Sequence, residues 1–419
     1  MSASHPITRK RLLRYFMDAC KPREDWLVGM EIERLGRREA DGLPLPYENG
    51  DASVRRVIDA LMEHRGGSRV LEGALPIGVD ADWGTISLEP GGQVEWSSRP
   101  AEDLEKLGEQ LDLHLDAMHR VGEQLGVRWL QTAIDPELPL DQMPWMPKSR
   151  YHIMRPYLGE RGRLAHLMMT QSASIQCAYD FADPEDFRRK FRCGALLAPI
   201  ATALFANSSL YEGRETGYQS YRQRVWQETD PDRCGLPDVV FDEGFGLESW
   251  LDYVLATPAI FLHRARGTVP AGGVPFRELM VLSGCDAIRD EDWETHISTI
   301  FTDVRSYTYI EVRSADGLPD ALAFSVPSLW TGLLYDESAL DAALAIGEAW
   351  DSGPRWRETM ECFARDGIHG SIGGRENRDL ILETLRIAAD GLTRAGCVGD
   401  GTRAGDALAA IADHHGLKL

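Results

Sequence analysis

Apolar and polar side chains alternate in three short segments that lie far apart along the chain. These segments are residues 29–33, 94–96 and 309–313. Because successive side chains of a β-strand point to opposite faces, the alternation predicts three strands, each with an apolar and a polar face. The polar faces carry acids, and we predict that these acids share one surface of a sheet: Glu31, Glu33, Glu95 and Glu311, with Arg313 beside the last.

The remaining pattern predicts helices where apolar residues recur at helical spacing, and strands in shorter β-rich runs. We predict helices at residues 7–25, 51–66, 101–126, 184–206, 246–256, 290–299, 326–351 and 376–396. Further strands are expected at 27–35, 127–134, 168–181, 259–264 and 305–313, with a hairpin region at 68–97. No repeat or linker interrupts this order. The simplest organisation is therefore one α+β domain over residues 1–419, with a mainly antiparallel sheet and helices packed outside it.

The 419 residues carry a formal net charge of −21. This charge argues against nucleic acid or an anionic membrane as the main partner, because both repel an acidic surface. No apolar run approaches the roughly 20 residues needed to span a bilayer. The amphipathic N-terminus lacks the features of a signal peptide. We therefore expect a cytoplasmic protein.

Seven cysteines are scattered along the chain without a CxxC motif. Their spacing matches neither a zinc site nor a disulfide framework, so we expect reduced thiols. Carboxylates from separate strands, in contrast, offer the oxygen ligands that a hard divalent cation requires. The acids of the three strands are therefore candidate metal ligands. The alternative is that they only form the polar faces of amphipathic strands.

Several longer motifs occur in a fixed order: LVGMEIERLG, TISLEPGGQVEWSS, TALFANSS, GYQSYRQRVWQETDP and YIEVRSADGLP. Together they resemble the plant-type glutamate–cysteine ligases and their relatives in ergothioneine biosynthesis, over residues 25–345, with a helical C-terminal part at 346–419. The resemblance implies a glutamine synthetase-like fold, in which a curved antiparallel sheet forms a funnel for metal ions and ATP. It also implies that ATP drives the joining of the γ-carboxylate of glutamate to the amine of cysteine, with release of ADP and phosphate.

The same resemblance implies roles for individual residues. It implies ligands for two or three magnesium ions, with manganese as a substitute, at Glu31, Glu33, Glu95 and Glu311, and less strongly at Glu89. Gln176 is implied close to a metal and the nucleotide. Arg313 is implied at the transferred phosphate, and Arg222 as the clamp of a substrate carboxylate. Arg150 and Arg155 are further candidates for substrate contacts, and a surface ion-pair network is the alternative for Arg222.

Three positions near the expected site depart from the family's motifs: Gln171, Cys177 and Ala178 stand where many members have Arg, Val and Asn. These departures leave the acceptor amine open, so a ligase for another amine is an alternative to one for cysteine. A second alternative is a non-catalytic relative that binds a nucleotide or an amino acid as a sensor. Retention of the acids and Arg313 favours an enzyme, as a monomer or a homodimer.

Overall fold

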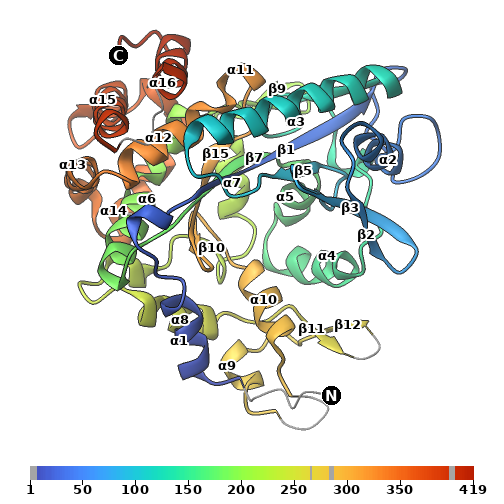
Figure 1. The fold of residues 1–419 in the computed structure, drawn as a ribbon, viewed down its shortest axis with the longest axis horizontal. Coiled ribbons are helices and arrows are strands. Elements are labelled where there is room, and N and C mark those ends of the chain that lie inside the picture. Colours follow the sequence, from blue (N-terminus) through green and yellow to red (C-terminus); the bar gives the residue numbers. More distant parts are fainter. Residues whose placement is uncertain (1–6, 265–266, 283–286, 396–401) are drawn as a thin grey trace.

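The computed structural model describes residues 7–264, 267–282, 287–395 and 402–419. A nine-stranded sheet runs through the molecule in the order β14-β15-β7-β1-β5-β4-β3-β2, and β6 also pairs with β1 (Figure 1). Its strands are β1 Val28–Arg38, β2 Ser68–Glu72, β3 Leu75–Ala81, β4 Gly84–Leu88, β5 Val94–Ser97, β6 Val127–Leu130, β7 Ser174–Tyr179, β14 Val304–Ser306 and β15 Ile310–Asp316. Every neighbouring pair is antiparallel. The predicted α+β class is confirmed.

Helices cover the apolar face of this sheet. Four of them contact the strands directly: α2 Val54–Arg65, α3 Leu104–Leu125, α6 Pro184–Leu204 and α12 Ser325–Leu334. A second layer packs against α6 and α12, and it consists of α13 Glu337–Gly347, α14 Gly353–Asp366, α15 Asn377–Ala395 and α16 Thr402–His414. The apolar face packs into one large core, so the opposite face of the sheet is left for polar residues.

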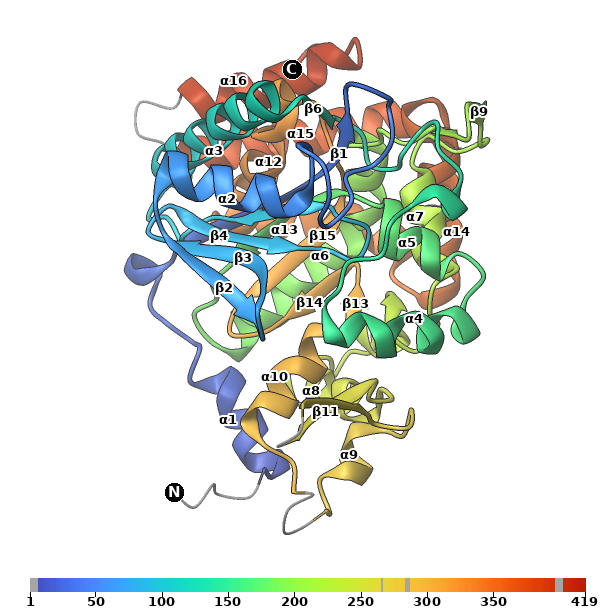
Figure 2. The same cartoon turned by 90° about the vertical axis from the view of Figure 1, so that its right-hand side faces the viewer.

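The polar face is bordered by three shorter helices, α4 Ser149–Arg161, α5 Ala165–Gln171 and α7 Tyr221–Gln227. A lobe at one end of the molecule contains α8 Leu247–Ala256, α9 Phe276–Leu279, α10 Asp290–Ser298 and the hairpin β11 Phe261–Arg264 with β12 Gly267–Pro270 (Figure 2). The first helix, α1 Arg9–Met17, packs on this lobe, where Arg9 forms ion pairs with Glu248 and Asp252.

Short elements complete the fold. They are β8 Leu210–Tyr211 with β9 Arg214–Glu215, β10 Cys234–Gly235 with β13 Phe301–Thr302, β16 Ser371–Ile372 with β17 Arg375–Glu376, and α11 Asp320–Ala323. Within the described ranges, no helix combines the length and apolar character needed to cross a membrane.

Several predicted boundaries were wrong. The strand expected over 168–181 begins only at Ser174, and residues 168–171 belong to helix α5. Ala, Leu, Met and Gln favour a helix there, and Thr170 bonds back to the carbonyl of His166. The expected strand at 305–313 is a hairpin of β14 and β15. Helix α1 ends at Met17 rather than at residue 25, because a helix through this segment would require Pro22, which has no N–H to donate and disfavours helical geometry in the residue before it.

Helix α7 was not predicted, because it carries polar residues where a helical apolar stripe is expected. Ser220 caps its N-terminus, and Arg222 and Gln223 are buried. Five of the cysteines lie in the described chain and are free: Cys20, Cys177, Cys193, Cys234 and Cys362. Cys285 and Cys397 lie outside the described residues.

Candidate active site

The register of the sheet brings the predicted acids to one face. Glu33 lies directly opposite Glu95 across β1 and β5, and Glu31 lies opposite Gln176 across β1 and β7. Glu311 comes from β15, which pairs with the other edge of β7. The residues that alternate with the acids are buried in the apolar core behind them: Ile32, Trp96 and Val312.

A cavity of 330 Å³ lies between this face of the sheet and helices α4, α5 and α7. Its acidic side is formed by Glu31, Glu33, Glu89 and Glu95. Four cations face these acids: Lys148, Arg150, Arg305 and Arg313. An apolar wall completes the cavity, formed by Met154, Met168, Met169, Trp226 and Phe301. The cavity therefore combines sites for cations, for anionic groups and for a small apolar side chain.

The acids lack sufficient counter-charge in this conformation. Burial and the neighbouring Glu311 raise the pKa of Glu31 to about 7, although Arg305 and Arg313 oppose the shift. Burial and nearby acids also raise the pKa of Glu33 and of Glu95. Bound divalent cations would supply the missing charge, so the donor set fits a hard metal ion. In the described part of the chain, no three acidic, His or Cys side chains are already gathered closely enough to hold one.

A second, larger cavity of 730 Å³ meets the first at the acids. Glu31 and Gln176 line both cavities, and Glu311 lines the larger one. Gly29 and Ala178 continue the same strand faces and contribute little side-chain volume, which leaves room above the sheet. The acids therefore lie at the junction of two cavities.

Two arginines bind Glu311. Arg305 donates to both of its carboxylate oxygens, and Nη1 of Arg313 donates to Oε2 at 2.8 Å and also to Oε1 of Gln176. Burial alone would raise the pKa of Glu311, but the two guanidinium groups outweigh it and hold the pKa below its usual value. Glu311 thus differs from the other acids, because the protein itself holds it ionised.

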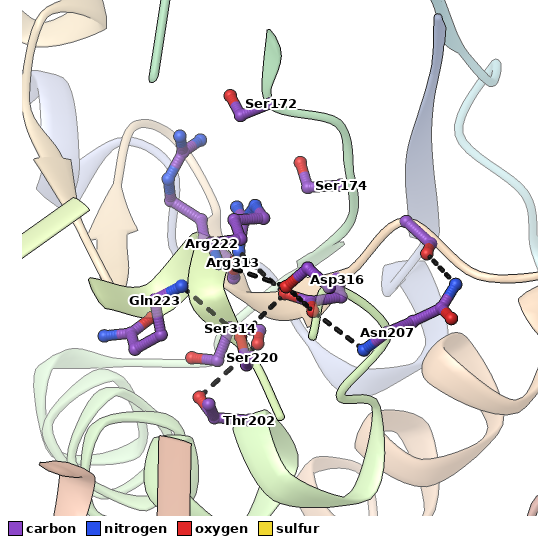
Figure 3. A network of polar contacts seen from close by, with 12 residues as sticks. Ser172, Ser174, Thr202, Asn207, Ser220, Arg222, Gln223, Arg313, Ser314 and Asp316 are labelled. Carbon is purple, nitrogen blue, oxygen red and sulfur yellow. Dashed lines mark hydrogen bonds and ion pairs between the residues drawn. The ribbon is translucent and has the colours of Figure 1, made fainter. Parts of the chain in front are cut away.

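Arg222 lies behind the cavity wall instead of lining it. Its Nη2 donates to the backbone carbonyl of Arg313 at 3.2 Å, and its Nη1 lies 4.0 Å from Oδ1 of Asp316 (Figure 3). Nε has no hydrogen-bond partner among the described residues. Asp316 is fully buried and accepts hydrogen bonds from the backbone of Asn207 and the hydroxyls of Ser208 and Ser220. In this conformation, Arg222 supports the strand that carries Arg313.

The two weaker candidates for substrate contacts, Arg150 and Arg155, lie on different faces of helix α4. Arg150 lines the smaller cavity, and within the described residues its Nε has no hydrogen-bond partner. Arg155 lies on the exposed face of the helix, with its guanidinium carbon 4.2 Å from the centre of the Trp145 ring. The structure therefore brings Arg150 to the cavity and places Arg155 on the surface.

Sequence reasoning missed several residues of the smaller cavity, among them Lys148, Trp226 and Arg305. Trp226 was visible in the YRQRVW motif, one helical turn after Arg222. Arg305 becomes recognisable only once residues 304–316 are read as a hairpin, because the turn places it opposite Glu311. No sequence pattern marked Lys148 as a site residue, since it follows a proline-rich connection that has no periodic pattern.

The three positions that depart from the family's motifs lie away from the smaller cavity. Gln171 is fully buried and donates to the carbonyl of Leu138 at 2.9 Å. Cys177 and Ala178 belong to the larger cavity, where the Cys177 side chain packs into the core as its strand phase predicted. None of the three is among the described residues that line the smaller cavity.

Comparisons with known proteins identify the class to which this fold and site belong. The chain matches glutamate–cysteine ligase family 2 over residues 27–418 and belongs to that family. The resemblance that the motifs indicated is confirmed.

Particular relatives and a solved structure agree with this assignment. The chain is 37% identical over 402 residues to chloroplastic glutamate–cysteine ligase B of Oryza sativa subsp. japonica. The matched region covers 94% of this chain and 79% of the relative. The chain is 35% identical over 400 residues to the chloroplastic glutamate–cysteine ligase of Arabidopsis thaliana, covering 94% and 75%. The structure of glutamate–cysteine ligase from Francisella tularensis in complex with AMP matches with a TM-score of 0.53 at 12% identity, over 93% of this chain and 81% of that one. At that identity the similarity is one of fold.

Proposed function

We propose that this protein joins the γ-carboxylate of glutamate to the amine of cysteine at the expense of ATP, giving γ-glutamylcysteine, ADP and phosphate. The observation that carries the proposal is the junction of two cavities at Glu31 and Gln176. A reaction that passes a phosphoryl group from a nucleotide to an amino acid requires two such sites with charged groups between them. Membership of the glutamate–cysteine ligase family supports the same reaction.

Amide formation requires activation of the carboxylate, because its oxygen is a poor leaving group. Transfer of the γ-phosphoryl group of ATP to the glutamate carboxylate forms an acyl phosphate. The cysteine amine then attacks the acyl carbon, so that a C–N bond forms, the C–O bond to phosphate breaks and the amine loses a proton. The protein's contribution to phosphoryl transfer is positioning and charge stabilisation.

The acids would hold the metal ions of this reaction. Glu31, Glu33, Glu95 and Glu311, with Glu89 at the cavity edge, offer the oxygen donors that two or three Mg²⁺ or Mn²⁺ ions require. When bound, such ions neutralise phosphate oxygens and so favour transfer. Arg313 has only Nη1 engaged by described side chains, which leaves its other donors available for the transferred phosphoryl group.

The two cavities suggest different substrates. We assign the larger cavity to the nucleotide, because the small residues Gly29 and Ala178 leave space for a flat ring above the sheet. We assign the smaller cavity to the amino acids, with Arg150 for a carboxylate and the Met-rich wall for the acceptor's side chain. The positions that depart from the family lie outside the smaller cavity, which favours cysteine over another acceptor. We further propose a cytoplasmic location, from the sequence features given above.

The proposal is tested with purified protein, glutamate, ATP and Mg²⁺ against a panel of amines. ADP release and product mass are measured together. We expect the highest kcat/KM with cysteine and a product of the mass of γ-glutamylcysteine. Preference for another amine would overturn the acceptor, and ADP release with a different carboxylate but never with glutamate would overturn the donor.

A further inference from the structure

An acid at the tip of an exposed hairpin caps a helix of the smaller cavity. Glu72 ends strand β2, and its carboxylate accepts hydrogen bonds from the backbone N–H of Ser149 at 2.8 Å and from the Ser149 hydroxyl at 2.6 Å. Ser149 is the first residue of α4. The two partners are 77 residues apart in sequence, and Figures 1 and 2 both show the end of the β2–β3 hairpin beside α4.

This contact supplies what α4 lacks locally. The first N–H groups of a helix have no partner within it, and a nearby side-chain oxygen usually accepts from one of them. At α4 the residue before the helix is Lys148, whose side chain has no acceptor and therefore forms no cap. A carboxylate at this end also interacts favourably with the helix dipole. Glu72 therefore serves as the cap of α4 from across the fold.

Strand β2 contributes little to the core, whereas its partner β3 places Val79 in it. The β2 residues before Glu72 are exposed, including Val70 at 40% and Leu71 at 54%. Gly73 adopts a left-handed conformation with φ of 63°, which permits the tight turn that places Glu72 at the tip. Within the described structure, β2 thus buries little apolar surface of its own, and its end holds one carboxylate over α4.

The capped turn carries two cations of the smaller cavity. Arg150 directly follows Ser149, and its guanidinium forms no ion pair with any described residue, so the position of its backbone decides where it points. Lys148 directly precedes Ser149 and donates to the carbonyl of Leu88 at 2.9 Å. A shift of the first turn of α4 would therefore move both cations relative to the acids.

We propose that Glu72 is a positioning residue that acts through Ser149 to hold Arg150 and Lys148 at the amino-acid cavity. The inference rests on the proposed function, because it takes Arg150 to bind the carboxylate of the donor. Glu72 lines neither cavity. Its effect is on the affinity for the amino acid rather than on the nucleotide.

The test compares Glu72→Ala, Ser149→Ala and the double variant. Glu72→Ala removes both hydrogen bonds, so it should raise the KM for glutamate about fivefold, the size of one lost helix cap, and leave the KM for ATP unchanged. Ser149→Ala removes only the hydroxyl bond and keeps the backbone N–H donor, so its effect should be smaller, and the double variant should match Glu72→Ala. Hydrogen exchange of the amides at residues 149–152 should become faster in Glu72→Ala and in the double variant. This readout reports the helix cap without any need for turnover.

Asp103→Ala provides the matched control. Asp103 caps α3 by accepting from the backbone N–H of Lys106 at 2.8 Å, and no described residue of α3 lines either cavity. It should lower the melting temperature by a similar amount without changing the KM for glutamate. An equal KM increase in this control would show a general effect of lost stability and would overturn the proposal.

Two further outcomes separate the proposal from the function on which it rests. If Arg150→Lys raises the KM for glutamate but Glu72→Ala does not, the positioning role is wrong and the proposed function stands. If wild-type protein shows no glutamate-dependent ADP release, the proposed function fails and the role of Glu72 at a substrate site fails with it.

Discussion

Arg305 and Glu311 lie directly opposite each other in the β14–β15 hairpin, and the guanidinium of Arg305 contacts both carboxylate oxygens of Glu311. The remaining nitrogen, Nη1, donates to the backbone carbonyls of Ser298 at 3.2 Å and Ile300 at 3.1 Å. Arg305 is therefore held by fixed partners on two sides. Arg313, in contrast, uses a single nitrogen and keeps its other donors toward the cavity. Arg305 thus holds Glu311 in place, whereas Arg313 has donors available to bind a substrate.

Replacing Arg305 by Lys should therefore disturb Glu311 while the charge is kept. Lys cannot reproduce the planar, two-point contact. We expect kcat to fall about tenfold or more, the scale of one lost charge-assisted hydrogen bond. Steady-state ADP release and thermal unfolding, measured on the same preparation, check this expectation.

Arg37→Lys is the control for the loss of a buried arginine pair. Arg37 binds both oxygens of Asp135, and the two side chains are about as buried as Arg305 and Glu311. A similar decrease in melting temperature with unchanged kcat is expected. Equal losses of kcat in both variants would instead assign the effect to stability.

Removal of metal should abolish activity, because the acids are proposed to act only through bound cations. EDTA should stop ADP release, and added Mg²⁺ or Mn²⁺ should restore it. Glu95→Gln should be inactive in either metal. Its metal-free form should be at least as stable as wild type, since one member of a buried like-charge cluster is neutralised. Full activity of wild type in EDTA would rule out the metal site.

The stability of the metal-free protein should decrease as the pH rises toward 7. Burial and the charge of Glu311 raise the pKa of Glu31 to about 7, above its ordinary value near 4.5. The folded protein therefore binds a proton in this range that the unfolded chain has lost. The resulting stabilisation is complete below pH ~4.5, is lost as the pH rises through 7, and amounts to at most about 3 kcal/mol.

Thermal unfolding in EDTA between pH 5 and 8 measures this effect. Glu31→Gln should reduce the slope, and the remaining slope should come from Glu33 and Glu95, whose pKa values burial also raises. Glu24→Gln, at an exposed position, should leave the slope unchanged. The same slope in wild type and Glu31→Gln would show that another group is responsible.

The sequence was sufficient to predict which side chains share a face of the sheet. It was not sufficient to predict the contacts between elements that are distant in the chain. Strict alternation placed Glu31 and Glu33 on one face of β1, because one face of each strand must be buried. The same rule placed the Cys177 side chain in the core. These predictions depend only on the period of a strand, which is a local property.

What the sequence could not supply depends on elements that are distant in the chain. Arg222 carries the same charge whether it faces a cavity or supports the Arg313 backbone, and only the packing of α7 against β15 decides between the two. The contact between Glu72 and Ser149 likewise requires the position of a hairpin relative to a helix 77 residues away. Neither relation leaves a periodic signal, so no reading of the pattern predicts it.

Activity should be insensitive to dithiothreitol. Cys177 and Cys193 are fully buried, and burial raises the pKa of both thiols, which keeps them protonated and unreactive. The measurement uses 2-aminobutyrate as a non-thiol acceptor, so that reductant does not act on the substrate. A large and reversible change of activity with redox state would contradict the expectation and point to a switch among the other cysteines.

Replacement of Arg150 and of Arg222 by Lys should change different kinetic parameters. Arg150 lines the amino-acid cavity with donors free, so Arg150→Lys should raise the KM for glutamate about tenfold, the scale of one lost charge-assisted bond, and leave the KM for ATP nearly unchanged. Arg222 instead supports the backbone of Arg313, so Arg222→Lys should mainly lower kcat and the melting temperature.

Steady-state kinetics with each substrate varied in turn distinguish these two arginines. If Arg222→Lys gives the profile expected of Arg150→Lys, then Arg222 is the carboxylate clamp that the family resemblance implies. Its guanidinium would then have to leave the Arg313 carbonyl and turn into the cavity when substrate binds. Nε of Arg222 has no hydrogen-bond partner among the described residues. Such a rearrangement would break the single hydrogen bond to Arg313, the 4.0 Å contact with Asp316 and a cation–π contact in which the guanidinium carbon lies 5.8 Å from the centre of the Trp226 ring.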